Sequence, residues 1–399
     1  MKALEGIRVL DLTHMVAGPY GAMLLADLGA ETIKIEPPGE GEIARRLPAD
    51  DPRHSPHGIG AYFLALNRNK RSLALDLKNP AGLEIFYELV RTADVVLSNF
   101  SVEATERLKI DYAHLAAINP RIITCTISGF GASGPSKDRT AFDMVAQGMS
   151  GMMALTGEPG GPPTRLGMPV ADLAAGMMAA TGILAALQAR HQSGRGQQID
   201  ISMLDVQISL LSYAAAMYLL SGEIPPRLGN AHFTHVPYNV YPCQDGYLIL
   251  AVITDRAWEG LMSVLDAPEL NTAENLERAG RLQHRDMIDQ RLGQIFLAGS
   301  QAAWVERLSA ARVPCAPVYD LAQALADEQV LHRQMVVEVA HPLGGTVRLV
   351  GNPLKLSENG EDTFTPPPLL GQDSAEILGR LLGKSAAEIA ALRQANVIP

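Results

Sequence analysis

The stretch GIRVLDLTHMVAGPYGAMLLADLGAETIKIE, residues 6–36, decides the fold. It holds a β-branched run at 8–12, an amphipathic stretch at 20–29 and a second β-branched run at 31–36, which predict a strand, a helix and a strand. Two strands joined by a crossover helix form a parallel βαβ unit. The segment therefore predicts the unit from which doubly wound sheets are built.

The same alternation continues downstream. Further strands are predicted at 73–77, from Asp94 and from Ile122, with a helix beginning at Ala81. Strands that alternate with helices of about 10 to 15 residues indicate an α/β fold, with a Rossmann-like parallel sheet that binds its ligands at the carboxyl ends of the strands. The first loop, THMVAGPYG (13–21), lacks the GxGxxG spacing, which weighs against a nicotinamide enzyme.

Residues 166–196 predict one long helix that ends at Gly194 or Gly196, with Arg190 and His191 in its last turn. Its middle consists largely of Ala and Gly, so another helix or a ligand is expected very close to its backbone. Later in the chain, a strand pair turning at Asp245-Gly246, helices over 256–308, a hairpin turning at Gly344-Gly345 and a terminal helix are predicted.

Composition limits the kinds of partner. The chain of 399 residues is 47% hydrophobic with a formal net charge of -10, and that charge opposes nucleic acid and anionic membrane surfaces. Its three cysteines, Cys125, Cys243 and Cys315, are far apart, so neither a disulfide framework nor a metal site is expected. No signal peptide or uninterrupted membrane-spanning run is visible, which predicts a cytoplasmic protein.

Asp172 lies near the start of the long helix, within the nearly apolar stretch GMPVADLAAGMM. A carboxylate in dry surroundings is costly unless it is hydrogen-bonded or placed at a helix N-terminus. Position alone leaves two readings open, a helix cap and a catalytic carboxylate.

The chain resembles the class III CoA-transferases, the CaiB/BaiF-like family of formyl-CoA and carnitine CoA-transferases. The resemblance rests on an ordered set of motifs: the opening stretch, LNRNKRSLALDL, ADVVLSNF, SGFGASGP, AFDMVAQGMSG, GMPVADLAAGMMAATGILAAL, GNAHFTHVPY, DGYLILAV, VPCAPVYDL and PPPLLGQ. Together they span essentially the whole chain.

That resemblance implies an enzyme whose nucleophile is Asp172, supported by Asp143, and which needs no metal or redox cofactor. It implies a large Rossmann-like CoA-binding domain from residues 1–200 and 330–399, a linker at 201–225 and a smaller α+β domain at 226–329. It also implies a homodimer of interlocked rings. The CoA contacts would fall on Val16, Ala17, Lys70, Leu73, Asn99, Phe100, Arg107, Leu108 and Arg139.

The resemblance further implies exchange of CoA between an acyl-CoA and a small carboxylic acid. Val16 stands where formyl-CoA transferase has glutamine, so formate and oxalate are disfavoured, and the motifs are closer to succinyl-CoA-dependent members that act on itaconate, mesaconate or glutarate. Candidate partners for the second carboxylate are Arg45, Arg46, Arg165, His232 and His235.

Three alternatives remain. An acyl-CoA racemase of this fold carries histidine before the aspartate where this chain has Phe142. An intramolecular CoA isomerase would use the same aspartate. A catalytically silent CoA-binding protein is the third.

Overall fold

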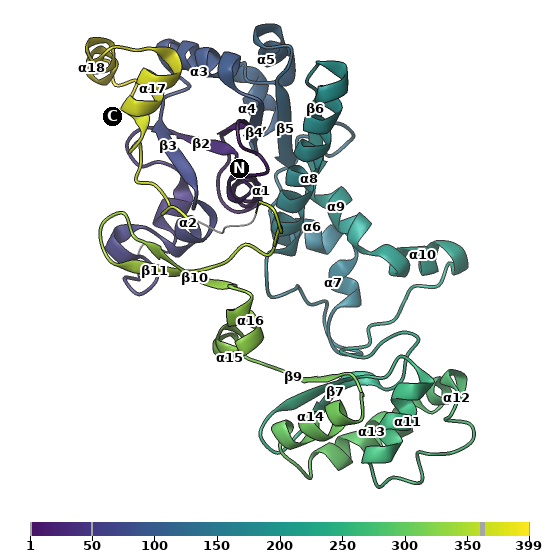
Figure 1. The fold of residues 1–399 in the computed structure, drawn as a ribbon. Helices are drawn as coiled ribbons and strands as arrows, with labels where there is room; N and C mark the ends of the chain where they lie inside the picture. The colour runs from purple at the N-terminus through teal and green to yellow at the C-terminus, as the bar shows by residue number, and fades with distance from the viewer. Residues whose placement is uncertain (1, 49–50, 360–363, 399) are drawn as a thin grey trace. The chain divides into compact units, whose positions relative to one another are not determined.

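The protein is described by a computed structural model over residues 2–48, 51–359 and 364–398. The chain forms two compact units (Figure 1). The larger comprises Met1–Met152, Leu166–Ala216 and Gln329–Pro399, and the smaller comprises Met153–Arg165 and Met217–Glu328.

A six-stranded parallel sheet forms the centre of the larger unit, in the order β3-β2-β1-β4-β5-β6. Because β1 lies between β2 and β4, the strand order reverses at β1, and this is where a doubly wound sheet opens a crevice for ligands. The strands are β1 (Arg8–Asp11), β2 (Glu31–Glu36), β3 (Lys70–Ala74), β4 (Val95–Ser98), β5 (Ile123–Ser128) and β6 (Gln198–Ser202).

Alternating side chains divide the larger unit into two cores. Val9 and Val95 belong to the core on one face, with helices α1 (Ala17–Asp27) and α8 (Val170–Ser193). Leu10 and Val96 belong to the core on the other face. The helices of that face are α3 (Pro80–Thr92), α5 (Tyr112–Ile118), α17 (Ser374–Leu382) and α18 (Ala386–Gln394).

The other elements of this unit are short. They are 3-10 helices Ile43–Arg46 and Pro56–Gly58, helices α2 (Ala61–Leu66), α4 (Val102–Arg107), α6 (Asp143–Met149) and α9 (Met203–Leu210), and the hairpin β10 (Val336–Ala340) and β11 (Thr346–Val350). Helices α7 (Met152–Leu155), α10 (Ser212–Ser221) and α16 (Glu328–His332) cross the boundaries between the units.

Helices α1 and α8 cross at two glycines. A Cβ added to Gly21 would lie 2.7 Å from the carbonyl oxygen of Gly176, and one added to Gly176 would lie 2.5 Å from that of Ala17. Both distances are too short for a side chain, so the backbones touch. The Ala- and Gly-rich stretch is therefore explained by a helix contact.

The sequence predictions match most elements, with four main differences. Helix α1 begins at Ala17 rather than Tyr20. Strand β3 begins at Lys70 rather than Leu73, and β6 was not anticipated because its QIDIS pattern lies largely exposed at the sheet edge. Helix α8 begins at Val170 rather than at 166, since Pro169 at the N-cap has ψ 73° and interrupts helical geometry. Gly194 ends α8 in the left-handed region, as predicted.

The smaller unit has an antiparallel sheet of order β7-β8-β9, formed by β7 (Tyr238–Pro242), β8 (Tyr247–Ala251) and β9 (Cys315–Pro317). Trp258, Phe296 and Trp304 fill its core. Its helices are α11 (Asp255–Val264), α12 (Arg278–Gln283), α13 (Arg285–Phe296), α14 (Gln301–Ala310) and α15 (Leu321–Ala326).

Helix α8 is long and apolar enough to cross a bilayer, and it is the one unbroken helix among the described residues that is. Half of its most apolar window is buried inside the protein, where α8 packs on α1, α9 and β5. A buried core helix has the same length and composition, so this property is weak evidence for a membrane.

Candidate active site

A cavity of about 390 Å³ opens at the carboxyl ends of β1 to β4, within the larger unit. This volume lies within the usual range for small-ligand sites. Its walls combine apolar side chains with three basic ones and three acidic ones, the last being Glu36, Glu42 and Asp76. The walls also include Leu12, His14, Ile35, Ile43, Leu75, Leu77, Lys78, Phe100, Arg107 and Leu108.

The loop between β1 and α1 is held from several sides by side chains. Asn99 accepts a bond from the backbone N–H of His14 at 3.0 Å and donates to the carbonyl of His14 at 2.8 Å. Glu42 accepts from the N–H of Met15, whose φ of 66° is unusual for a side-chain-bearing residue. Lys34 donates to the carbonyl of Thr13 at 2.8 Å. The cavity wall is therefore held in one conformation.

Charged residues are buried beneath this loop. Lys34 forms an ion pair with Glu42 at 2.8 Å, and Lys70 forms one with Asp11 at 2.8 Å. Burial lowers the pKa of Lys70 to about 8 despite the carboxylate of Asp11. These ion pairs are buried at the sheet, and Lys34 also holds the loop through its bond to the carbonyl of Thr13.

Asp143 caps α8 from a neighbouring helix. Pro169 at the N-cap of α8 provides no side-chain bond. Instead, Oδ1 of Asp143 accepts from the backbone N–H of Ala171 at 2.8 Å and from that of Asp172 at 3.4 Å. The first-turn amides of α8 are thereby satisfied by a carboxylate, as a helix N-terminus favours.

Asp172 itself is partly buried in the first turn of α8, and within the described part of the chain no group donates to its carboxylate. Burial, and then the negative charge of Asp143, raise the pKa of Asp172 to about 6. The carboxylate is thus more basic than usual and not occupied as a helix cap. Gly176 lies four residues, about 6 Å along the axis, beyond Asp172, so its contact with Ala17 places the start of α1 near that carboxyl group.

The predicted CoA-binding residues lie in several environments. Phe100, Arg107 and Leu108 line the cavity, and Asn99 braces its loop. Val16 and Ala17 form the start of α1. Arg139 is exposed and stacks over Phe130 at 5.0 Å.

The side chains of Lys70 and Leu73 are both buried inside the larger unit. Lys70 donates to Asp11, to Asn67 and to the carbonyl of Pro19, which uses all three of its N–H groups, and Leu73 belongs to the core. From the same segment the structure instead puts Leu75 and Lys78 on the cavity. The signal for Lys78 was its position directly after the predicted strand 73–77, where a doubly wound sheet binds ligands.

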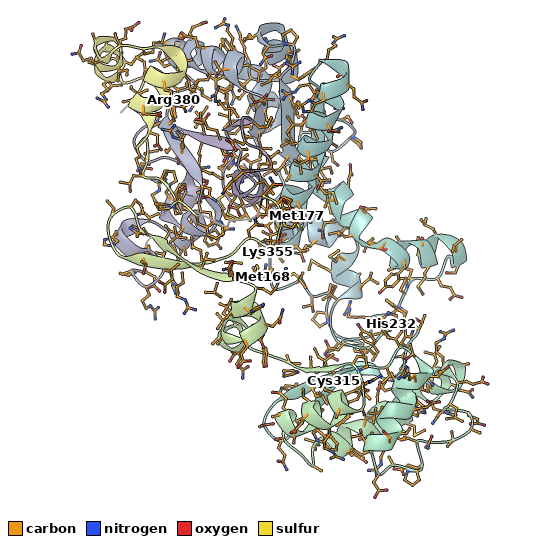
Figure 2. The ribbon with its side chains drawn as sticks, in the orientation of Figure 1. Met168, Met177, His232, Cys315, Lys355 and Arg380 are labelled. Atoms are coloured by element: carbon orange, nitrogen blue, oxygen red, sulfur yellow. The ribbon has the colours of Figure 1, made fainter. Side chains whose placement is uncertain are left out.

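The candidate substrate residues are also dispersed. Arg45 is buried, with Nε 2.7 Å from Glu36 and Nη1 donating to the carbonyl of Pro368, so its guanidinium is occupied inside the protein. Arg46 is exposed and pairs with Glu40. The others belong to the smaller unit: Arg165 is exposed, and His232 and His235 contact each other on one loop, Nδ1 to Nδ1 at 3.2 Å. Figure 2 labels His232 on this loop.

Over the described ranges, no group of three His, Cys, Asp or Glu side chains could hold a metal ion. The functional groups gathered at this site are carboxylates, amides and the three basic side chains of the cavity.

A doubly wound α/β protein with a ligand-sized cavity at its strand ends, and with a partly buried carboxylate of raised pKa in the first turn of α8, has the features of an acyl-transfer enzyme. The sequence pattern of CoA-transferase family III matches residues 4–374, and the chain belongs to this family of enzymes.

Relatives of the chain are likewise named as CoA-transferases. The chain is 34% identical over 402 residues to "Succinyl-CoA:glutarate CoA-transferase" of Homo sapiens, covering all of this chain and 90% of the relative. It is 38% identical over 358 residues to "Acetyl-CoA:oxalate CoA-transferase" of Acetobacter aceti, covering 88% and 89%. The structure resembles a CAIB/BAIF family protein from Brucella suis with a TM-score of 0.85 at 34% identity, covering 95% of this chain and 99% of that one.

Proposed function

We propose that the protein transfers CoA from succinyl-CoA to a small dicarboxylic acid through covalent intermediates on Asp172. The observation that supports this most is the state of that carboxylate, which is partly buried, receives no hydrogen bond from the described residues, and has a pKa raised to about 6. A carboxylate that is basic yet still ionised at neutral pH suits a nucleophile.

In the first half of the reaction, an Asp172 oxygen attacks the thioester carbon of the donor. The C–S bond breaks, leaving a mixed anhydride and a CoA thiolate. The thiolate then attacks the aspartyl carbonyl, the donor acid departs as a carboxylate, and an aspartyl-CoA thioester remains.

In the second half, the acceptor carboxylate attacks this thioester and expels the thiolate. The resulting anhydride is attacked by the thiolate at the acceptor's acyl carbon, which yields the new acyl-CoA and restores Asp172. Each addition creates an oxyanion, and we propose that the uncapped first-turn amides of α1, near Gly18, donate to it.

CoA would lie in the cavity at the strand ends. Phe100 and Leu108 offer apolar surface for the adenine and pantetheine, whereas Lys78 and Arg107 offer positive charge for phosphates. Val16, Ala17, Asn99 and the exposed Arg139 complete the proposed set. Because Lys70 and Leu73 are buried, we propose that they support the cavity without touching CoA.

Several acceptors fit the proposal. The human relative is named for glutarate and the Acetobacter relative for oxalate, and both are dicarboxylates. We propose glutarate, itaconate or mesaconate for this chain, with Arg46, Arg165, His232 and His235 as candidates for the second carboxylate. Arg45 remains a weaker candidate since Glu36 already holds its guanidinium.

We also propose a cytoplasmic homodimer, interlocked as in the family. Supporting this, α6, α8 and α9 pack together and expose many large apolar side chains, including Met144 at 58% and Ile208 at 47%. Figure 2 labels Met168 and Met177, which are both exposed and flank the first turns of α8. Apolar surface on that scale is typical of an interface.

The direct test is to trap the covalent intermediate. The protein is incubated with succinyl-CoA, quenched with hydroxylamine and digested, and mass spectrometry should find a hydroxamate on Asp172. Asp172→Asn should abolish exchange while retaining CoA binding, and Asp205→Asn, an exposed acid on α9, serves as the control. Full exchange by Asp172→Asn would refute the mechanism.

Two further assays and the hydroxamate trap together separate the alternatives. An isomerase would convert one acyl-CoA without a second acid, and a racemase would exchange the α-proton of its acyl group with solvent deuterium. A silent CoA-binding protein would bind CoA and give no hydroxamate.

A further inference from the structure

Gln147 is a fully buried residue of α6 whose side chain makes two hydrogen bonds. Its Nε2 donates to Oδ2 of Asp143 at 2.7 Å, and its Oε1 accepts from the backbone N–H of Leu166 at 3.0 Å. The N–H of Leu166 can only donate, so the oxygen of the amide must face it and the NH2 group must face Asp143. The orientation of this amide is therefore fixed by the network.

With Gln147 in place, both oxygens of Asp143 act as acceptors. Oδ2 receives the Gln147 amide, and Oδ1 receives the backbone amides of Ala171 and Asp172. Without Gln147, nothing within the described residues would hold Oδ2, and the carboxylate could rotate about its Cβ–Cγ bond away from the start of α8.

We propose that Gln147 is a positioning residue of the transfer reaction, which holds the Asp143 carboxylate against the first turn of α8 and ties it to the backbone of Leu166. This inference rests on the proposed role of Asp172. Among the described residues, Gln147 forms no hydrogen bond with Asp172 or with the residues that line the cavity, so its influence on the reaction passes through Asp143.

The bond to Leu166 also holds the chain at the residue where it returns to the larger unit. Residues Met153–Arg165 belong to the smaller unit, and Leu166 is the first residue after them to belong to the larger one. Gln147 therefore fixes the point where the chain re-enters the larger unit, and joins that point to the carboxylate that caps α8.

The charges around Asp172 make the inference testable by pH. The other elements packed against α8 carry three acids: Asp27 of α1, Asp205 of α9 and Asp200 of β6. Asp27 is paired with Arg68, and Asp200 accepts from the N–H of Ala132. Of all these, Asp143 alone contributes to the raised pKa of Asp172. Displacing Asp143 should therefore lower that pKa and move the acid limb of the rate profile to lower pH.

The test compares kcat and KM for succinyl-CoA across acid and neutral pH. Gln147→Met keeps the volume and removes both bonds, and kcat should fall about tenfold, the loss typical of one hydrogen bond to a charged group, while KM stays the same. Gln147→Glu retains the acceptor for Leu166 but can donate to Asp143 only when protonated, so its activity relative to that of the natural protein should fall as pH rises.

Gln207→Met is the matched control. Gln207 of α9 is also fully buried, and its amide has no partner in the part of the chain that the structure describes, so its replacement should leave both kcat and the pH profile unchanged. If Gln147→Met fails to fold, the isosteric Gln147→Glu decides.

The inference is overturned if both Gln147 variants keep the natural pH profile and kcat per folded molecule, with only a lower melting temperature. Asp172→Asn is measured in parallel. Exchange by that variant would refute the mechanism itself, whereas an inactive Asp172→Asn beside unaltered Gln147 variants would refute the inference alone.

Discussion

The carboxylate of Asp143 caps the helix that carries Asp172, and at the same time its charge opposes the ionisation of Asp172. One side chain therefore performs two tasks. It stabilises the start of α8 by satisfying backbone amides, and it makes the neighbouring carboxylate more basic. A neutral capping residue on the helix itself, such as Ser or Thr, would have satisfied an amide without fixing a second charge beside Asp172.

Asp172→Asn should stabilise the fold at neutral pH. The pKa of Asp172 rises from 3.8 to about 6 on folding, so the native state binds the proton more tightly than the unfolded state. Above pH 6 the ionised group therefore lowers the free energy of unfolding by its full amount. This loss declines as pH falls from 6 to 3.8 and is absent below 3.8. Two pKa units correspond to about 2–3 kcal/mol at most. Urea unfolding at neutral and at acid pH measures the gain, and an equal gain at both would contradict it.

Asp143→Asn should destabilise the protein and shift the acid limb of kcat to lower pH. The new amide sets an NH2 group against that of Gln147, and the charge that opposes Asp172 is gone. A broken buried network costs about 1–3 kcal/mol. Thermal unfolding and a pH profile measure both effects. Asp111→Asn, at the N-cap of α5, is the control and should leave the profile unchanged; an unshifted profile for Asp143→Asn would disprove the electrostatic role.

Much of this architecture could be predicted from periodicity. The alternation within residues 6–36 predicts β1, α1 and β2 because each face of the sheet is buried under helices. Likewise Gly194 marks the end of α8, since a left-handed backbone suits glycine.

The environment of each charge could not be predicted. Lys70 and Lys78 are eight positions apart in one basic segment, yet one is buried against Asp11 and the other lines the cavity. The difference arises from the start of β3, where Lys70 is buried and reaches a carboxylate on β1, which lies beyond β2 in the sheet. Such pairing depends on strand order, which local sequence does not encode. Gln147 was not predicted either. Asp143 is its neighbour on the same helix, but its other partner is the backbone N–H of Leu166, in a different segment of the chain, and no side-chain pattern marks such a bond.

Gly176→Ala should weaken the crossing of α1 and α8. The added Cβ would lie 2.5 Å from the carbonyl oxygen of Ala17, and neither backbone can yield cheaply. Overpacking of this kind costs about 1–3 kcal/mol, visible as a lower melting temperature. Gly182→Ala on the same helix meets only the Ile199 side chain at 3.2 Å and should cost less. Equal losses would show that α8 tolerates displacement from α1.

Arg107→Ala and Lys78→Ala should weaken CoA binding with little effect on kcat. Both side chains line the cavity, and the pair that Arg107 forms with Glu103 is exposed, so its loss has little structural effect. Loss of one charge-assisted bond predicts a rise in Kd of about tenfold or more, measurable by calorimetry. Arg91→Ala, at the end of α3 and outside the cavity, is the control. Unchanged Kd values would place the phosphates elsewhere.

Lys34→Met should be among the most destabilising substitutions in the larger unit. Lys34 and Glu42 are both buried, so removing the cation strands a carboxylate out of water, at a cost of about 3–5 kcal/mol. Adding Glu42→Gln removes that charge while keeping an oxygen for the N–H of Met15, so the double variant should be more stable than Lys34→Met alone. Urea unfolding of both single variants and the double variant gives the coupling energy. Strictly additive losses would mean that the pair does not act as a unit and that the β1–α1 loop is held by Asn99 and Asp11 instead.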